Sequence, residues 1–349
     1  MSDRRRWTHH PLFQLTQVRY REFFREPEAV FWVFIFPVLL AAGLGIAFRN
    51  RAPDRTGVAV VAAETRLADA LRSTGELEVS VLSDSAAAEA LRTGEVALVV
   101  APAPDGKVEY RYDDTRPESR IARLLVDDAL QRAAGRRDPA TVSDRLVHER
   151  GSRYIDFLVP GLLGMNLMGS GIWGVGFAIV DARKKRLLKR LIATPMSRPQ
   201  YLASFVLSRL TLLVIEVGLL LGFGALVFGV PFRGSLLILV TICVVSSLAF
   251  TSLGLLVSSR VQTMEGASGL MNLVMLPMWI FSGVFFSASR FPDSLQPFIQ
   301  ALPLTAVVDA LRANILRGAG WGTMGPEIAI IMAWLGVSFL LALKLFRWR

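Results

Sequence analysis

Polar side chains that lie inside long apolar stretches are the residues of this sequence best placed to do chemistry. Glu216 is the one acidic residue of the apolar stretch 210–232, and it follows Arg209 by about two helical turns. An ionisable side chain in a membrane span costs roughly 2.5–3.5 kcal/mol on insertion scales, so it commonly marks a substrate or proton pathway. Asn166 and Asn272 are uncharged polar residues near the interior of two other apolar stretches. These three residues form the candidate substrate path.

Each of these residues also has a structural interpretation. A carboxylate near the inner membrane interface can accept hydrogen bonds from a neighbouring helix or from Arg209. Asparagine amides in spans commonly form hydrogen bonds between helices, which stabilises a bundle without any contact to a substrate. The sequence leaves both interpretations of Glu216 open.

Other kinds of chemical site have little support among the residue types. The chain has one cysteine, Cys243, and three histidines, so neither an internal disulfide nor a Cys-rich or His-rich metal site is expected. The paired acids Asp113-Asp114 and Asp127-Asp128 fit a solvated turn and a solvated helix face better than a cation site. No Gly-x-x-x-x-Gly-Lys-Ser/Thr motif occurs, so the chain has no P-loop for a nucleotide. We predict no catalytic residue, no metal and no cofactor on this chain.

The composition is that of a membrane protein. Of the 349 residues, 52% are hydrophobic and 19% are charged, whereas a soluble domain has about 25% charged residues. A helix needs roughly 20 apolar residues to cross the hydrocarbon core of a bilayer. Six apolar stretches approach or exceed this length: 29–48, 157–180, 210–232, 234–259, 266–289 and 328–343. The sequence therefore predicts an α-helical integral membrane protein with six transmembrane helices, and the glycines of the second stretch predict close helix packing.

Positive charges predict the orientation of these helices. Residues 1–28 carry six arginines, and the loop 181–209 carries eight Lys or Arg residues against one acid, Asp181. Because Lys and Arg accumulate in cytoplasmic loops, both termini are expected in the cytoplasm, with the chain crossing the cell (inner) membrane several times. The net charge of +10 then reflects these loops rather than a nucleic-acid partner.

The predicted organisation has four parts. Residues 1–28 form a cytoplasmic amphipathic segment, 29–48 the first transmembrane helix, 49–154 an extracytoplasmic domain and 155–349 a five-helix transmembrane domain. Within the last part, 290–327 is expected to form re-entrant or surface helices on the outer side, because several prolines and an acid interrupt its apolar run.

The segment 49–154 has the alternating pattern of a small α/β domain. Strands are expected at 58–62, 78–82, 96–101 and 108–112, and helices at 65–73, 85–92 and 118–134. The apolar face of the last helix is expected to consist of Ile121, Leu124, Leu125 and Leu130. Alternating strands and helices predict an α/β domain with a modest core.

The loop 181–209 is expected to contain a short basic helix with one apolar face. Leu187, Leu188, Leu191 and Ile192 fall on one side of this helix, and Pro195 and Pro199 end it. Three explanations compete. In the first, the basic residues bind anionic lipid headgroups, at roughly 1 kcal/mol for each Lys or Arg. In the second, they bind nucleic acid, although the aromatic residues or motifs that usually accompany such binding are absent. In the third, the helix docks on a partner protein.

Two sequence strings favour the partner protein. The string Leu191-Ile-Ala-Thr-Pro-Met-Ser-Arg198 resembles the permeases of the type-2 ABC exporter family, in which this loop is a coupling helix that fits a groove in a separate ABC ATPase. The segments Ser282-Gly-Val-Phe-Phe286, Phe291-Pro292, Leu302-Pro-Leu-Thr305, Asp309-Ala-Leu-Arg312 and Gly318 resemble the outer part of the same family. Arg186, Leu187 and Lys189 stand where the family often has an acidic residue and a Gly-Thr pair.

The resemblance implies a transport subunit and not an enzyme. It implies contacts to the ATPase from these residues: Leu187, Leu188, Arg190, Leu191, Ile192, Thr194, Pro195, Met196 and Ser197. ATP and magnesium would bind to the ATPase, and the partners would be this ATPase, a second permease copy or a sister permease, and the lipid bilayer. The expected activity is export of a lipophilic or amphipathic small molecule or lipid by alternating access. The alternatives are a membrane receptor with a ligand-binding outer domain, a secondary transporter that uses Glu216 and a membrane-embedded enzyme that acts on lipid.

Overall fold

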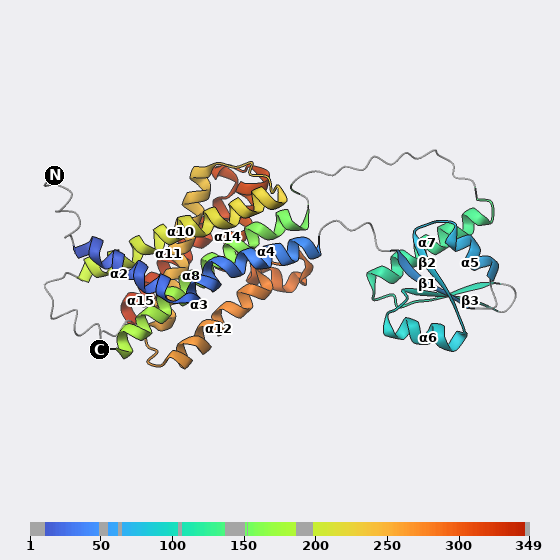
Figure 1. Ribbon diagram of the computed structural model, residues 1–349, viewed down its shortest axis with the longest axis horizontal. Helices are drawn as coiled ribbons and strands as arrows, with labels where there is room; N and C mark the ends of the chain where they lie inside the picture. The colour runs from blue at the N-terminus through green and yellow to red at the C-terminus, as the bar shows by residue number, and fades with distance from the viewer. Residues whose placement is uncertain are drawn as a thin grey trace. The chain divides into compact units, whose positions relative to one another are not determined.

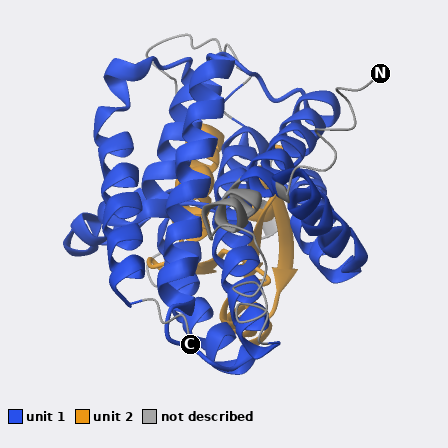
Figure 2. Cartoon of the chain, turned by 90° about the vertical axis from the view of Figure 1, so that its left-hand side faces the viewer, with its two compact units in different colours: residues 1–49, 148–349 blue, residues 50–147 orange. Residues whose placement is uncertain are grey.

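The computed structural model describes residues 11–48, 55–61, 65–103, 107–136, 151, 153–185 and 198–345, and it describes only the backbone of 11, 65–66 and 198–206. The chain divides into two compact units, which Figure 2 shows in different colours. One unit consists of Met1–Arg49 and His148–Arg349 and is helical, and the other is Asn50–Val147.

Five helices of the described residues are long and apolar enough to cross a membrane (Figure 1). The first, Pro27–Ala47, consists of α3 (Pro27–Val30), a π-helix (η1, Phe31–Ile35) and α4 (Phe36–Ala47). The others lie in α8 (Tyr154–Lys184), α10 (Arg198–Phe228), α11 (Leu236–Ser258) and α15 (Gly325–Leu345). The predicted helical membrane protein is confirmed, with the α/β unit between its first and second spans.

The helix at the predicted fifth span ends earlier than the uncharged stretch 266–289 of the sequence. The helix α12 covers Met264–Phe281, 18 residues, and is not among these five. It ends because Gly283 adopts a left-handed conformation with φ of +74°. Glycine adopts this conformation readily and is common directly after a helix C-terminus. Two helical turns follow, and then α13 (Gln296–Ala301) and α14 (Pro303–Arg317); the helical segment Asp293–Ala301 meets α14 at a bend of 84°. This bent pair is either one broken span or a re-entrant segment, so the span count is five or six.

The helix α8 is the centre of the helical unit. It packs against α11, α14, α12, α4 and α10. At the α8–α11 crossing, a Cβ atom on Gly254 would lie 2.7 Å from the carbonyl oxygen of Ile172, and one on Gly171 would lie 2.7 Å from Cβ of Phe250. These two glycines let the helix backbones approach closely, as small residues do in membrane bundles. The predicted close packing of the second span therefore takes place within the chain at this crossing.

Adding a methyl group at this crossing should destabilise the bundle. We expect Gly254→Ala to lower the free energy of unfolding by about 1–3 kcal/mol, because its Cβ would meet backbone atoms that cannot move aside. The measurement is the thermal unfolding midpoint of the purified chain in detergent. Gly174→Ala is the matched control, because no atom lies within 4 Å of its added Cβ. Equal midpoints for the two variants would contradict this account of the crossing.

An amphipathic helix precedes the first span. This helix, α2 (Pro11–Arg25), packs against α10 and buries Thr16. At its end, the ring of Phe23 meets the ring of Phe34 in the π-helix at 5.7 Å in an edge-to-face arrangement. The helix is therefore fixed to both the first and the third span.

The α/β unit contains a four-stranded sheet in the order β2-β1-β3-β4. Its strands are β1 (Thr56–Val61), β2 (Leu77–Leu82), β3 (Leu98–Pro102) and β4 (Val108–Arg111), and only β4 is antiparallel to its neighbour. The helices α5 (Thr65–Arg72) and α7 (Pro117–Ala133) cover one face, and α6 (Asp84–Thr93) covers the other. The predicted α/β domain is confirmed element by element.

The helix α7 faces the sheet differently from the prediction. Its buried residues are small or β-branched: Ser119, Ala122, Val126 and Ala129. The predicted core residues Ile121 and Leu124 are instead 54% and 65% exposed, whereas Leu125 and Leu130 are half-buried. The helix has two apolar stripes, and the small residues allow it to lie closer to the sheet than the larger ones would.

Candidate functional site

The centre of the candidate site is a buried ion pair on α10. Glu216 is 1% exposed, and its Oε1 lies 2.7 Å from Nη1 of Arg209. A second bond of 3.2 Å joins Nη2 of Arg209 to Oε2 of Glu216. The two residues are seven positions apart, which places them on one face of the helix. The carboxylate that the sequence singled out is therefore paired within its own helix.

Serines from two neighbouring helices complete the surroundings of this pair. Nη2 of Arg209 donates to the hydroxyl of Ser170 on α8, and Nε donates to the hydroxyl of Ser247 on α11 at 3.3 Å. The Ser170 hydroxyl lies 2.5 Å from the carbonyl oxygen of Asn166 and 3.2 Å from Oε2 of Glu216. Its single proton serves one of these two acceptors at a time. The ion pair thus joins α8, α10 and α11.

Asn166 extends these contacts to the first span. Its Nδ2 donates to the carbonyl oxygen of Val33 at 3.1 Å, and Val33 lies inside the π-helix. Side chains of neighbouring elements often enter the hydrogen-bond ladder at such irregular turns, which are frequent at functional sites. We call Asn166, Ser170, Arg209, Glu216 and Ser247 the polar cluster. It connects four membrane helices through hydrogen bonds in a region shielded from water.

The structure brings two of the three candidate path residues together. Glu216 and Asn166 both belong to the polar cluster, through Ser170. Asn272 lies half-buried on α12, and among the described residues no hydrogen bond joins it to the cluster. Sequence analysis missed Ser170 and Ser247. The available signal for Ser170 was its position four residues after Asn166, which places both on one face of α8.

The predicted contacts to an ATPase lie outside the described residues. This applies to Leu187, Leu188, Arg190, Leu191, Ile192, Thr194, Pro195, Met196 and Ser197. The described start of this loop is held in two ways. Nζ of Lys185 lies 2.9 Å from Asp181, and this hydrogen bond raises the pKa of Lys185. Arg183 donates to the carbonyl oxygens of Ser258, Ser259 and Val261, at the end of α11 and just beyond.

Arg183 therefore binds backbone carbonyl groups and is not simply one of the positive charges of a cytoplasmic loop. The sequence counts it among the loop's positive charges, whereas the structure shows it binding carbonyl groups at a helix C-terminus. Such carbonyls carry partial negative charge, so an arginine there is favourable. The contact ties the start of the loop to the connection between α11 and α12.

Two of the outer segments singled out in the sequence, 282–286 and 309–312, meet on α8. Nη2 of Arg312 donates to the carbonyl oxygen of Gly283 at 2.6 Å and to that of Phe157 at 3.1 Å. Its guanidinium also lies over the ring of Phe157, 3.5 Å from the ring centre. A Cβ atom on Gly161 would lie 2.6 Å from the carbonyl oxygen of Val284, so glycine is required for this approach. Arg312 thus fixes α14 and the end of α12 to the start of α8.

In each of the two acid pairs of the α/β unit, at least one carboxylate accepts hydrogen bonds from a nearby group. Asp113 accepts hydrogen bonds from the backbone N–H and the hydroxyl of Thr115, and these bonds lower the pKa of Asp113. Asp127 accepts a bond of 2.8 Å from Gln131. Within the described ranges, no group of three His, Cys, Asp or Glu residues is arranged to hold a metal ion.

The sequence is similar to that of known membrane transport proteins. A family model described as ABC-2 family transporter protein matches residues 28–344. ABC transporter G family member 20 of Dictyostelium discoideum is 28% identical over 245 residues, which is 66% of this chain and 33% of that protein. Inner membrane transport permease YhhJ of Escherichia coli is 27% identical over 173 residues, 49% of this chain and 46% of the relative.

A resistance protein gives a similar alignment. Linearmycin resistance permease protein LnrN of Bacillus subtilis is 25% identical over 174 residues, which is 50% of this chain and 45% of that protein. The chain thus covers about a third to a half of the length of these three relatives. The family match extends from the first span through α15 and confirms the resemblance that the two strings indicated. The chain therefore belongs to the ABC-2 family of transporter proteins, a family of membrane permeases.

Proposed function

We propose that this chain is the membrane-spanning permease subunit of an ATP-driven exporter and that a separate ABC ATPase energises it. The observation that carries this proposal is the family match over residues 28–344. The sequence supplies no P-loop, so ATP and magnesium bind on the ATPase. A second copy of the chain, or a sister permease, completes the membrane part.

The loop 181–209 is the proposed coupling element. Its apolar face, with Leu187, Leu191 and Ile192, docks on the ATPase, and the residues from Arg190 to Ser197 form the rest of the contact. Nucleotide shifts the transporter between inward-closed and outward-open states only if the ATPase makes contacts in one state that it does not make in the other. The bonds of Arg183 to the end of α11 support this role, because displacement of the loop would reach α11 as well as α8.

The proposed orientation has six spans, with α12 as the fifth, and both termini in the cytoplasm of a cell with the chain in its inner membrane. The excess of Lys and Arg in 1–28 and 181–209 supports this orientation. The name of the Escherichia coli relative, an inner membrane transport permease, agrees with it. The α/β unit then lies on the extracytoplasmic side, and the bent helices within 290–327 lie toward that side.

The proposed cargo is a lipophilic or amphipathic small molecule or lipid. Arg209 neutralises Glu216, so this pair adds no net charge to the membrane interior. A hydrophilic polymer would need an extended polar path, whereas the five long helices are mostly apolar. The Bacillus subtilis relative is named for resistance to linearmycin, which agrees with export. Glu216, Asn166 and Asn272 remain the proposed path residues.

Transport into membrane vesicles tests this function. Inside-out vesicles that contain the chain and its ATPase should accumulate a lipophilic fluorescent dye or a fluorescent phospholipid analogue when ATP is added. Glu216→Gln should change the rate if the carboxylate contacts cargo. Accumulation driven by a proton gradient without ATP would instead support a secondary transporter. Accumulation under neither condition, with the ATPase bound and active, would exclude this cargo class.

A further inference from the structure

The helix α7 carries two large apolar side chains that its own unit leaves exposed. Ile121 and Leu124 lie one turn apart and are 54% and 65% exposed, and Leu125 beside them is half-buried. Scattered apolar residues are ordinary on a protein surface, but neighbouring ones rimmed by charges mark interaction sites. Smaller residues on the opposite stripe already supply the packing against the sheet. We call these three side chains the α7 surface; Ile121 and Leu124 are available to a partner, and Leu125, which also packs against the core of its own unit, borders them.

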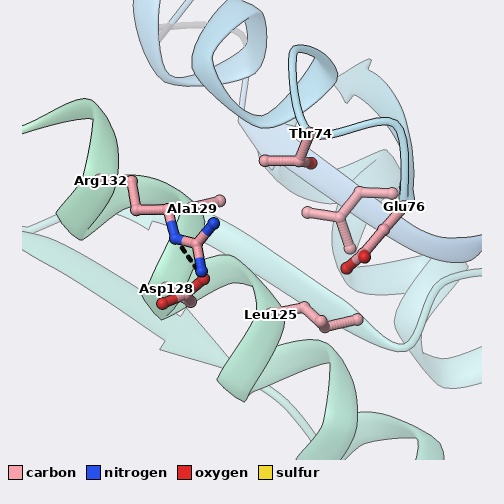
Figure 3. A pocket seen from close by; sticks show the side chains of 7 residues that line it. Thr74, Glu76, Leu125, Asp128, Ala129 and Arg132 are labelled. Carbon is pink, nitrogen blue, oxygen red and sulfur yellow. Dashed lines mark ion pairs between the residues drawn. The ribbon is translucent and has the colours of Figure 1, made fainter. Parts of the chain in front are cut away.

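A small groove borders the α7 surface (Figure 3). It has a volume of about 160 Å³ and is lined by Thr74, Glu76, Leu77, Leu125, Asp128, Ala129 and Arg132. Leu77, Leu125 and Ala129 are apolar, while Asp128 and Arg132 form an ion pair of 2.9 Å at the rim. Pockets for drug-sized ligands measure about 300–1,000 Å³, so this groove suits a single side chain.

One pair of charges on α7 is complementary when the same helix runs in reverse. Arg120 lies in its first half, between Glu118 and Arg123, and Asp128 lies in its second half, where it also pairs with Arg132 and Arg136 of its own unit. If two copies of α7 cross antiparallel at Leu124, then Arg120, four residues before the crossing, faces the partner's Asp128, four residues after it. A twofold axis produces this contact twice, as in any isologous interface. A parallel arrangement would instead place like charges together.

We propose that the α7 surface binds the α7 surface of a second copy of this chain, with the two helices antiparallel and Leu124 at the twofold axis. Ile121 of each copy then lies near the groove of the other copy, which an aliphatic side chain can fill. The contact is small, but in the proposed transporter the membrane spans hold two permeases together, and this raises the effective concentration of one unit near the other. The inference rests on the proposed function, since it assigns the α/β unit a part in pairing two permease copies.

Disulfide formation in native membranes tests this pairing. The full chain with Cys243→Ser and Leu124→Cys should form a disulfide-linked dimer on mild oxidation, because residue 124 meets its own counterpart at the axis. The matched control is Glu89→Cys in the same background. Glu89 is exposed on α6, on the opposite face of the sheet, and should give no dimer. Absence of a dimer at 124, or equal yields at 124 and 89, would overturn the proposal.

Charge exchange tests the antiparallel register. In the Leu124→Cys chain, Arg120→Asp or Asp128→Arg alone should lower the dimer yield about tenfold, because each places like charges opposite each other twice. The two changes together should restore the yield, since every pair is then reversed. If both single variants match the parent chain, the register is wrong. Recovery of a P-loop ATPase with a chain that does not cross-link would overturn this inference alone and leave the proposed function standing.

Discussion

Arg209→Met should destabilise the helical unit by about 3–5 kcal/mol, the largest effect that we expect from a single substitution. This range is typical when one partner of a buried ion pair is removed and the other charge remains without compensation. Glu216 is 1% exposed, and water cannot replace the guanidinium that lies 2.7 Å from its carboxylate. The measurement is the thermal unfolding midpoint of the purified chain in detergent, together with the amount of folded protein recovered from membranes.

The double variant Arg209→Met/Glu216→Met is the decisive control. Replacing both partners of a buried pair by apolar residues is often neutral or stabilising, so most of the lost stability should return. Ser170 would then lose Arg209 as its donor but keep its bond to the carbonyl oxygen of Asn166. If Arg209→Met unfolds at the same temperature as the parent chain, Arg209 does not stabilise the Glu216 carboxylate. If the double variant is less stable than the single one, the polar cluster contributes more than the ion pair.

Leu191→Glu/Ile192→Glu should abolish binding of the ATPase while the chain still inserts into the membrane. Both side chains lie on the predicted apolar face of the loop helix, and a carboxylate there would lose its water in the interface. Copurification should fall at least about tenfold, because an unpaired charge in an interface costs several kcal/mol. The measurement is the molar ratio of ATPase to permease after gentle solubilisation.

Lys189→Gln is the matched control for the loop. It removes one charge from the polar side of the same predicted helix and leaves its apolar face intact. The ATPase should remain bound to this variant. An unchanged ratio in Leu191→Glu/Ile192→Glu would show that this face is not the contact, and an equal loss in Lys189→Gln would indicate that the loop binds through its charges.

The regular elements could be predicted from the sequence because their periodicity is local. The strand expected at 108–112 is Val108–Arg111, and the first span expected at 29–48 is Pro27–Ala47. The end of α12 could not be found this way. The uncharged run continues past Phe281, and the backbone turn at Gly283 leaves no mark on hydropathy. For α7, two apolar stripes share one helix, and periodicity cannot choose which of them meets the sheet.

The candidate site was predicted in part. An acid inside an apolar stretch identified Glu216, and the seven-residue spacing made Arg209 a candidate partner. Ser170 and Ser247 come from other helices, at separations of 46 and 31 positions from Glu216, so no local pattern relates them to it. The hydrogen bond from Asn166 depends on a π-helix in the first span, an irregularity that apolar composition does not reveal.

Gentle purification of this chain from its native membranes tests the central claim most directly. If the chain is the permease of an ATP-driven exporter, a P-loop ATPase should copurify in stoichiometric amount, and the complex should hydrolyse ATP. Recovery of the chain without an ATPase and without nucleotide turnover in several mild detergents would contradict the claim. That result would direct attention to Glu216 and the α/β unit as parts of a secondary transporter or a receptor.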